Sequence, residues 1–362
     1  MKQAGSDKHG SMEADLRSAV ERIAAKVLAE HGPVTEMVRL HRPNRRSVGA
    51  GGGGAGGGGE AASAAAVEEL SIGFADGSSM QVIFKDLAPK TSGADGHDRG
   101  HASHARRPSF LHDPRREIAA YRSVLSNGQV AAPRFLGAVE DDAQQRFWLF
   151  IEDVPGRPLA ELKLDFWLDA ARWLAGMHRQ FEPTIQSLAG DAPLLRYDAD
   201  YFRLWILRAA ENHTSLRGLM TKYDRVVDRL ASLPATFVHG GFFASNVLVQ
   251  NSPWGALIRP VDWEMAGIGP GLIDLAALIT DDGGAEAWGD AERGQLVGAY
   301  YEVWSQGQHA ATPFELFAED LDFCLLHQAV QCLGWPQRCP TPGEGRNWQA
   351  EALVLSKRVG LV

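Results

Sequence analysis

The chain has 362 residues, of which 45% are hydrophobic, so it is long enough for two packed lobes with a sizeable core. Its formal net charge of -9 argues against nucleic acid as a partner, because non-specific binding to nucleic acid needs a basic surface. The first residues hold no apolar run typical of a secretory signal, and no stretch approaches the roughly 20 apolar residues of a membrane span. Three cysteines in so long a chain do not make a disulfide framework, which predicts a cytoplasmic protein.

The N-terminal part, residues 1–33, is predicted to be a polar tail followed by a helix. Apolar residues recur at helical spacing over residues 12–30, and a Gly-Pro pair ends the pattern. The polar side of this helix mixes acids and bases, which favours packing on the protein over binding to a membrane surface. A first strand is predicted over residues 34–42.

A glycine-rich stretch, residues 49–66, follows that strand. It contains several matches to G-x-G-x-x-G, but the strand-turn-helix unit of a dinucleotide site is missing, so it predicts a flexible coil. Two strands are then predicted over residues 67–75 and 79–87, joined by a turn with the sequence Ala-Asp-Gly-Ser. Lys85 lies on the second of these strands among apolar neighbours. It is either a surface lysine whose stem covers apolar area or a ligand of phosphate.

The next segment, residues 89–113, is rich in Gly, Ser, His and Arg and has no period, which predicts a flexible loop. A helix is predicted over residues 114–126, because Pro occupies its first position and Asp113 can cap it. Glu117 lies in the first turn, where the helix dipole favours an acid. Two further strands are predicted over residues 135–139 and 147–152.

The remainder of the chain, residues 153–362, is predicted to be largely helical. Helices are expected over residues 165–181, 197–211, 216–233, 285–307, 313–333 and 346–357. Cys324, His327 and Cys332 recur at helical spacing, but without a Cys-x₂-Cys pair they do not predict a zinc site. Buried thiols are the expected state of these cysteines.

A hairpin within residues 237–264 carries the polar residues that predict a function. Two short apolar runs, residues 246–250 and 256–261, form its strands, and Asn246 and Asp262 lie at its ends. Amide and carboxylate oxygens are ligands that Mg²⁺ accepts in proteins, and such an ion usually bridges substrate phosphates. We therefore predict that Asn246 and Asp262 bind magnesium.

This hairpin resembles the catalytic and metal loops of the aminoglycoside phosphotransferase branch of the protein-kinase-like fold. That branch reads H-G-D-x-x-x-x-N, followed by D-x-E after one hairpin. The chain matches the pattern at His239, Gly240, Asn246, Asp262 and Glu264. It departs from the pattern at Gly241, which stands at the position of the catalytic Asp. The resemblance implies an α+β fold with two lobes: a small antiparallel-sheet lobe with one helix, residues 34–152, and a larger helical lobe, residues 153–362.

The same resemblance assigns roles to residues of both lobes, with ATP and Mg²⁺ as cofactors. Lys85 would hold the α- and β-phosphates of ATP, and Glu117 would pair with that lysine. Glu152 and Val154, at the hinge between the lobes, would contact adenine through their peptide groups. The glycine-rich stretch would be either an expanded form of the loop that covers the phosphates or an inert insertion, and we favour the insertion.

His239 and Asp274 would brace the catalytic loop, whereas Gly241 leaves the loop without its usual base. Such a base contributes about 10²–10⁴-fold, so its loss slows phosphoryl transfer without abolishing it. Glu264, or a water beside Gly241, is a candidate substitute. The implied function is ATP-dependent phosphorylation of a hydroxyl on a small molecule such as an aminoglycoside or other antibiotic, a sugar or an amino alcohol. The alternative is a pseudokinase that serves as a nucleotide-binding or scaffold protein.

Overall fold

The computed structural model describes residues 3–27, 29–40, 66–88, 108, 111–128, 130–188, 190, 192–253, 255–281, 288–306, 312–336 and 347–361. The predicted glycine-rich coil of residues 49–66 and the predicted loop of residues 89–113 lie almost wholly outside these residues. The chain divides into two compact units. The first comprises Met1–Ser47, Ala64–Lys90 and Pro133–Val154, and the second comprises Val48–Ser63, Thr91–Ala132 and Pro155–Val362.

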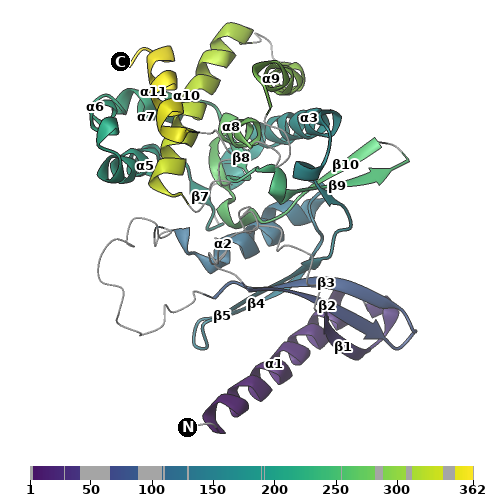
Figure 1. Cartoon of the computed structure of the whole chain (residues 1–362). Helices are drawn as coiled ribbons and strands as arrows, with labels where there is room; N and C mark the ends of the chain where they lie inside the picture. The colour runs from purple at the N-terminus through teal and green to yellow at the C-terminus, as the bar shows by residue number, and fades with distance from the viewer. Residues whose placement is uncertain are drawn as a thin grey trace. The chain divides into compact units, whose positions relative to one another are not determined.

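The first unit is an antiparallel sheet with one long helix packed on it (Figure 1). Its elements are α1 (Gln3–Val27), η1 (Ala29–His31), β1 (Val34–Leu40), β2 (Ala66–Phe74), β3 (Ser79–Asp86), β4 (Phe135–Asp141) and β5 (Arg146–Glu152). The strand order is β1-β2-β3-β5-β4, and every neighbouring pair is antiparallel. Apolar side chains of α1, such as Leu16 and Val20, form one buried cluster with Leu70, Val82 and Phe150 of the sheet. The predicted strands of this unit are therefore confirmed. The predicted N-terminal helix is present, but it already begins at Gln3, so the prediction of a polar tail before it was wrong. The helix predicted over residues 114–126, which the resemblance placed in the small lobe, belongs to the second unit.

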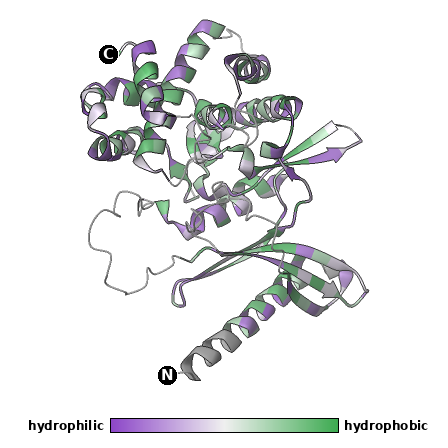
Figure 2. Cartoon of the chain, in the orientation of Figure 1, coloured by the Kyte–Doolittle hydropathy of each residue, from purple (hydrophilic) through white to green (hydrophobic). Residues whose placement is uncertain are grey.

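The second unit is mainly helical, with two small sheets. Its helices are α2 (Pro114–Ala119), η3 (Ala120–Val124), η4 (Leu125–Asn127), η5 (Leu159–Glu161), α3 (Leu164–Phe181), η6 (Glu182–Thr184), α4 (Ile185–Leu188), α5 (Ala199–Asn212), η7 (Thr214–Leu216), α6 (Arg217–Met220), α7 (Asp224–Ser232), η8 (Ala244–Asn246), η9 (Trp263–Met265), α8 (Leu272–Thr280), α9 (Asp290–Trp304), α10 (Phe314–Gly334) and α11 (Trp348–Arg358). Its strands are β6 (Arg157–Pro158), β7 (Leu195–Arg196), β8 (Ala235–Val238), β9 (Val247–Ser252), β10 (Gly255–Pro260) and β11 (Gly267–Pro270). Figure 2 shows that the helices of this unit carry both hydrophobic and hydrophilic residues.

The helix predicted over residues 114–126 begins as the sequence indicates but is not uniform. Asp113 caps it, because its side chain accepts a hydrogen bond from the backbone N–H of Arg115. The helix then passes from α2 through the π-helical η3 into the 3₁₀-helical η4. Glu117 is buried in the first of these segments. Short π-helical stretches inside helices are frequent near functional sites.

The predicted hairpin is confirmed as β9 and β10, which pair antiparallel with Val247 opposite Pro260. This register places the residues next to the strands, Asn246 and Asp262, at the same end of the hairpin. The two small sheets have the strand orders β10-β9-β6 and β7-β11-β8. β8 and β11 therefore flank the chain segments that lead into and out of the hairpin.

The cysteines follow the prediction only in part. Cys324 is a buried free thiol, and burial raises its pKa well above the ordinary value. Cys332 is instead disulfide-bonded, so the prediction of a buried thiol was wrong there. Within the described ranges, no group of three or more His, Cys, Asp and Glu side chains is placed to hold a metal ion, and no helix is long and apolar enough to cross a bilayer.

Candidate active site

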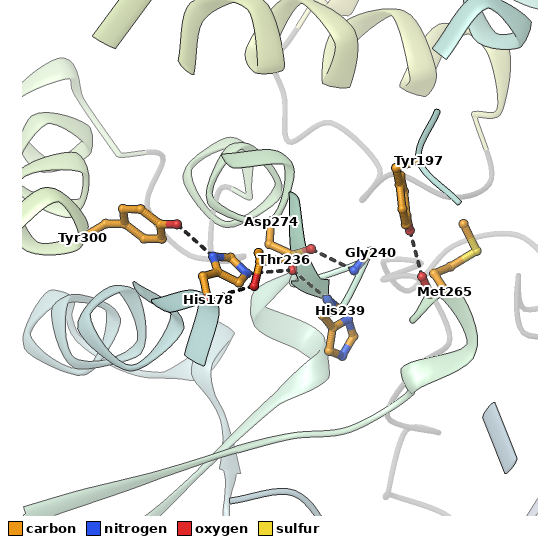
Figure 3. A network of polar contacts seen from close by, with 8 residues as sticks. All are labelled: His178, Tyr197, Thr236, His239, Gly240, Met265, Asp274 and Tyr300. Atoms are coloured by element: carbon orange, nitrogen blue, oxygen red, sulfur yellow. Dashed lines mark hydrogen bonds and ion pairs between the residues drawn. The ribbon is translucent and has the colours of Figure 1, made fainter. Parts of the chain in front are cut away.

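The loop that follows β8 is fixed at its start by a single buried carboxylate (Figure 3). Asp274, in the first turn of α8, accepts the backbone N–H of His239 at 2.7 Å on one oxygen and that of Gly240 at 2.8 Å on the other. The side chain of Asp274 is 1% exposed. Hydrogen bonds to an ionised acceptor are about twice as strong as neutral ones. The predicted bracing contact between Asp274 and the loop is therefore present.

The carboxylate of Asp274 also contacts a buried histidine of α3. His178 Nε2 lies 3.4 Å from Asp274 Oδ2, and His178 Nδ1 lies 2.8 Å from the hydroxyl of Tyr300. Burial raises the pKa of Tyr300 well above its ordinary value, so the hydroxyl keeps its proton and can donate it to Nδ1. Thr236 of β8 donates to the backbone carbonyl of His178 at 2.7 Å. This chain of contacts, drawn in Figure 3, orients the carboxylate on which the loop depends.

His239, at the start of the loop, contacts the chain segment that follows β10. Its Nε2 lies 2.9 Å from the carbonyl oxygen of Val261, and because a carbonyl only accepts, Nε2 carries the proton. Its ring lies against Trp263, with ring centroids 4.5 Å apart. His239 thus contacts residues on both sides of Asp262.

A second carboxylate holds the far end of the loop. Asp281, the residue after α8, is buried and accepts the backbone N–H of Ala244 at 2.7 Å. Asn246 donates its side-chain Nδ2 to the carbonyl of Gly241 at 3.0 Å. Because Nδ2 is used in this way, Oδ1 is the Asn246 atom that can bind a metal ion. The backbone N–H of Val261 donates to the carbonyl of Asn246 at 2.9 Å, which ties the two ends of the hairpin together.

Asp262 has an unusual backbone. Its φ of 66° and ψ of 61° lie in the left-handed region, and its side chain is buried. Most non-glycine residues in this region are strained by about 1–3 kcal/mol. Asp and Asn adopt it more easily, because their short polar side chains can form local hydrogen bonds. Such strain persists where the surroundings fix it, and η9 directly after Asp262 is fixed by Trp263, whose Nε1 donates to the carbonyl of Pro260 at 3.1 Å.

The donor set fits Mg²⁺. Asn246 Oδ1 and the carboxylate of Asp262 are both oxygen donors, and the hairpin register brings the two residues to one end. Mg²⁺ is commonly bound by one or two such protein oxygens, with waters and substrate phosphates completing its octahedron. Because the Asn246 amide nitrogen donates to the carbonyl of Gly241, the amide oxygen Oδ1 is the atom that would bind Mg²⁺.

An arginine on α2 contacts the same region. Arg116 is buried and donates from Nη1 to the carbonyl of Leu111 at 3.1 Å and to that of Glu264 at 3.4 Å. Arg116 therefore links the helix that carries Glu117 to the turn that carries Asp262 and Glu264.

The residues predicted to bind nucleotide are divided between the two units. Lys85 is buried on β3 of the first unit, and Glu117 is buried on α2 of the second, so their predicted pairing stays a prediction. The backbone N–H of Glu152 donates to the carbonyl of Arg134 at 2.9 Å. Val154 is buried at the end of the first unit.

Two glycines stand side by side in the loop, and only one of them is required by its backbone. Gly240 has a φ of 76°, and a Cβ there would overlap the hydroxyl of Tyr197 and the carbonyl oxygen of Met265. Tyr197 itself donates to that carbonyl at 2.8 Å (Figure 3). Gly241 is buried but is not among the described residues with positive φ.

Several residues of the site have no signal in the sequence pattern. His178 lies inside an apolar helical repeat, Arg116 precedes the predicted Glu117, and Asp281 and Tyr197 lie at the ends of helices or strands. Each was missed because it contacts a residue of the site that is distant in the chain. A buried polar residue within an apolar helix, as at His178, is the one signal that sequence reasoning could have used.

Comparison with known proteins agrees with this geometry. Residues 98–314 match the model of the phosphotransferase enzyme family. No curated protein matches the sequence. A GDP complex of a mutant aminoglycoside 2'-phosphotransferase-IIIa is similar in structure, with 14% identity, a TM-score of 0.51 and coverage of 95% of this chain and 97% of that chain. The amicoumacin kinase hAmiN, in complex with AMP-PNP and Ca²⁺, gives 13% identity, a TM-score of 0.51 and coverage of 96% and 95%.

An ethanolamine kinase from Plasmodium vivax is also similar, with 10% identity, a TM-score of 0.50 and coverage of 81% of this chain and 78% of that chain. At such low identity these structures indicate the fold alone. The family match, in contrast, spans more than half of the chain and includes the whole loop and hairpin. The chain therefore belongs to the phosphotransferase enzyme family and has the protein-kinase-like α+β fold that its sequence predicts.

Proposed function

We propose that this protein transfers the γ-phosphate of ATP to a hydroxyl of a small molecule. The observation that carries the proposal is the loop of residues 239–246, which two buried carboxylates hold in place beside the oxygen donors of Asn246 and Asp262. Structures with the same fold are named for kinases of an aminoglycoside, of amicoumacin and of ethanolamine, all of which are small molecules with hydroxyl groups.

Each predicted residue has a place in this function. Asn246 and Asp262 would hold Mg²⁺, which neutralises charge on the phosphates when it is bound. Lys85 would contact the phosphates, with Glu117 orienting it. Glu152 and Val154 would contact adenine through their peptide groups. His239 would keep Asp262 in position through Val261 and Trp263.

The glycine at position 241 leaves two candidate functions, a kinase with a reduced rate and a pseudokinase. Positioning and charge stabilisation account for most of phosphoryl-transfer catalysis, so an enzyme that keeps its metal ligands remains active at a reduced rate. Glu264 or a water beside Gly241 could accept the proton in place of the usual Asp. The second candidate is a pseudokinase that binds nucleotide without turnover, which the absence of a carboxylate at Gly241 favours.

The first test is the melting temperature with and without millimolar ATP, in Mg²⁺ and in chelator. A ligand at 100 times its dissociation constant adds about 2.7 kcal/mol of apparent stability, which raises the melting temperature by several degrees. The Asp262→Asn variant is the matched control, because Asn tolerates the left-handed backbone but lacks the charge. It should lose the Mg²⁺-dependent part of the shift. The absence of any shift with ATP or GTP would refute the kinase proposal.

Turnover separates the kinase from the pseudokinase. ADP release in a screen of hydroxyl-bearing small molecules should reveal an acceptor-dependent rate in the kinase version. A nucleotide-dependent rise in melting temperature without ADP release for any acceptor would favour the pseudokinase.

A further inference from the structure

Four helices of the second unit, α8 to α11, surround a cavity. Its volume is about 510 Å³, which lies within the range of about 300–1,000 Å³ that is usual for small-molecule sites. Each of the four helices contributes apolar side chains to its wall, among them Ile279 of α8, Val297 of α9, Leu321 and Leu325 of α10 and Leu355 of α11. The cavity is therefore large enough for a small molecule with an apolar body.

This cavity lies on the face of α8 that is turned away from the catalytic loop. Successive residues of an α-helix are about 100° apart around its axis, so Asp274 and Asp281, which hold the loop, are only about 20° apart. Ile279 and Thr280 line the cavity, and they lie about 140° and 120° from Asp274 on its two sides. In Figure 1, α9, α10 and α11 lie above α8, whereas β8, which leads into the loop, lies below it. The cavity is thus a separate site, with α8 between it and the loop.

Two apolar side chains of the cavity are exposed to solvent. Phe314, at the start of α10, is 43% exposed, and Val354, on α11, is 57% exposed. Exposed apolar side chains that gather at a concave surface with polar residues around it mark binding sites. The face of an aromatic ring such as that of Phe314 also attracts cations.

The polar lining of the cavity is acidic. It holds three carboxylates and two guanidinium groups, a net formal charge of -1, from Asp290, Asp322, Glu351, Arg293 and Arg358. The side chain of Asp322 is 18% exposed and accepts a hydrogen bond from Arg358 Nη1 at 2.8 Å. Burial nevertheless raises the pKa of Asp322 above its ordinary value, although Arg358 acts to lower it. Arg358 therefore compensates this carboxylate only in part, and a second positive charge would stabilise it.

An anion is the less favourable ligand for this cavity. It would compete with Asp322 for the guanidinium group of Arg358. A partly buried carboxylate that loses its partner is costly, so any gain from the anion would be offset. An ammonium group has no such cost, because it adds a partner to Asp322 and leaves Arg358 in place.

We propose that the cavity between α8, α9, α10 and α11 binds a small amine with an apolar body, whose ammonium group contacts Asp322. A primary amine has a pKa of about 10.4, as in lysine, so it is protonated at pH 7. The apolar walls bury its body, and the ring of Phe314 attracts its charge. This inference does not depend on the proposed function, because the cavity is separate from the catalytic loop.

Isothermal titration calorimetry of the full chain with three matched probes tests the choice of ligand. The probes are 4-phenylbutylamine, 4-phenyl-1-butanol and 4-phenylbutanoate, which share one apolar body and differ in charge. The amine should bind at least about tenfold more tightly than the alcohol, because it adds a charge-assisted hydrogen bond. The carboxylate should bind most weakly of the three.

Variants of α10 test the location of the site. Asp322→Asn should weaken binding of the amine by about 10–100-fold and leave that of the alcohol nearly unchanged. Glu319→Gln is the matched control, because it removes the same charge from the same helix at a residue that does not line the cavity, and its effect should be much smaller. Ala318→Phe fills the cavity and should abolish binding of both probes. Melting curves verify that the variants fold, and Asp322→Asn tests the site even if Ala318→Phe does not.

Four outcomes would overturn the inference. The first is no binding of the amine at millimolar concentration, and the second is equal affinity for the three probes. The third is an affinity for the amine that Asp322→Asn leaves unchanged, since the amine would then bind elsewhere. The fourth is a dimer in sedimentation velocity that Val354→Asp dissociates, because a second copy of the chain would then cover the cavity.

Discussion

Gly240 and Gly241 are adjacent glycines, but the backbone requires glycine only at the first of them. Gly240 is required by its positive φ and by the approach of Tyr197 and Met265. Gly241 has no such backbone requirement, and the carboxylate expected there is simply missing. The loop therefore has the glycine that its backbone needs, whereas no carboxylate stands at position 241, where the resembling pattern has its Asp.

The largest effect is expected for Gly240→Ala. The new Cβ would meet a backbone carbonyl and a bonded hydroxyl at distances that no real contact shows, and the residue would keep a positive φ. We expect a loss of more than about 4 kcal/mol in the free energy of unfolding, or failure to fold. Gly241→Ala is the matched control and should lose less. Urea unfolding measures both, and equal losses would contradict the distinction between the two glycines.

Asp274→Ala should have the next largest effect. It would leave two buried N–H groups without acceptors and remove the partner of His178, so we expect a loss of about 3–5 kcal/mol in unfolding free energy. Asp274→Asn retains one acceptor oxygen and should lose less. A loss below 1 kcal/mol for the alanine variant in chemical denaturation would show that the carboxylate does not hold the loop.

Asp281→Ala should have a smaller effect on stability and a selective effect on the metal end of the loop. It removes the acceptor of one backbone N–H, which costs about 1–3 kcal/mol. Because Ala244 lies in the same 3₁₀ turn as Asn246, the Mg²⁺-dependent rise in melting temperature with ATP should also decrease. An unchanged shift in the folded variant would exclude Asp281 from positioning Asn246.

Tyr197→Phe should give the smallest effect of the four. It deletes one hydrogen bond, to the carbonyl of Met265, and should lower the unfolding free energy by about 0.5–1.5 kcal/mol. The same hydroxyl is the nearest obstacle to a Cβ at Gly240. The double variant with Gly240→Ala should therefore lose less stability than the sum of the two single variants. Strict additivity in a double-mutant cycle would show that the hydroxyl does not restrict Gly240.

The sequence predicted those parts of the fold and site that depend on local pattern. The β9–β10 hairpin, the cap at Asp113 and the positions of Asn246 and Asp262 follow from residues close together in the chain. Contacts between distant segments could not be predicted in this way. Arg116 lies 148 residues from Glu264, His178 lies 96 residues from Asp274, and Asp281 lies 37 residues from Ala244. No periodicity or spacing within a segment encodes such contacts.

The helix α8 sets the length of the loop. Asp274 lies in its first turn and Asp281 directly after its end, and each holds one end of the segment from His239 to Ala244. A helix rises about 1.5 Å per residue, so the two carboxylates are separated by roughly 10 Å along a stiff rod. An insertion or deletion in the loop would detach one anchor, because the rod cannot stretch. The length of α8 thus restricts how many residues can lie between His239 and Asn246.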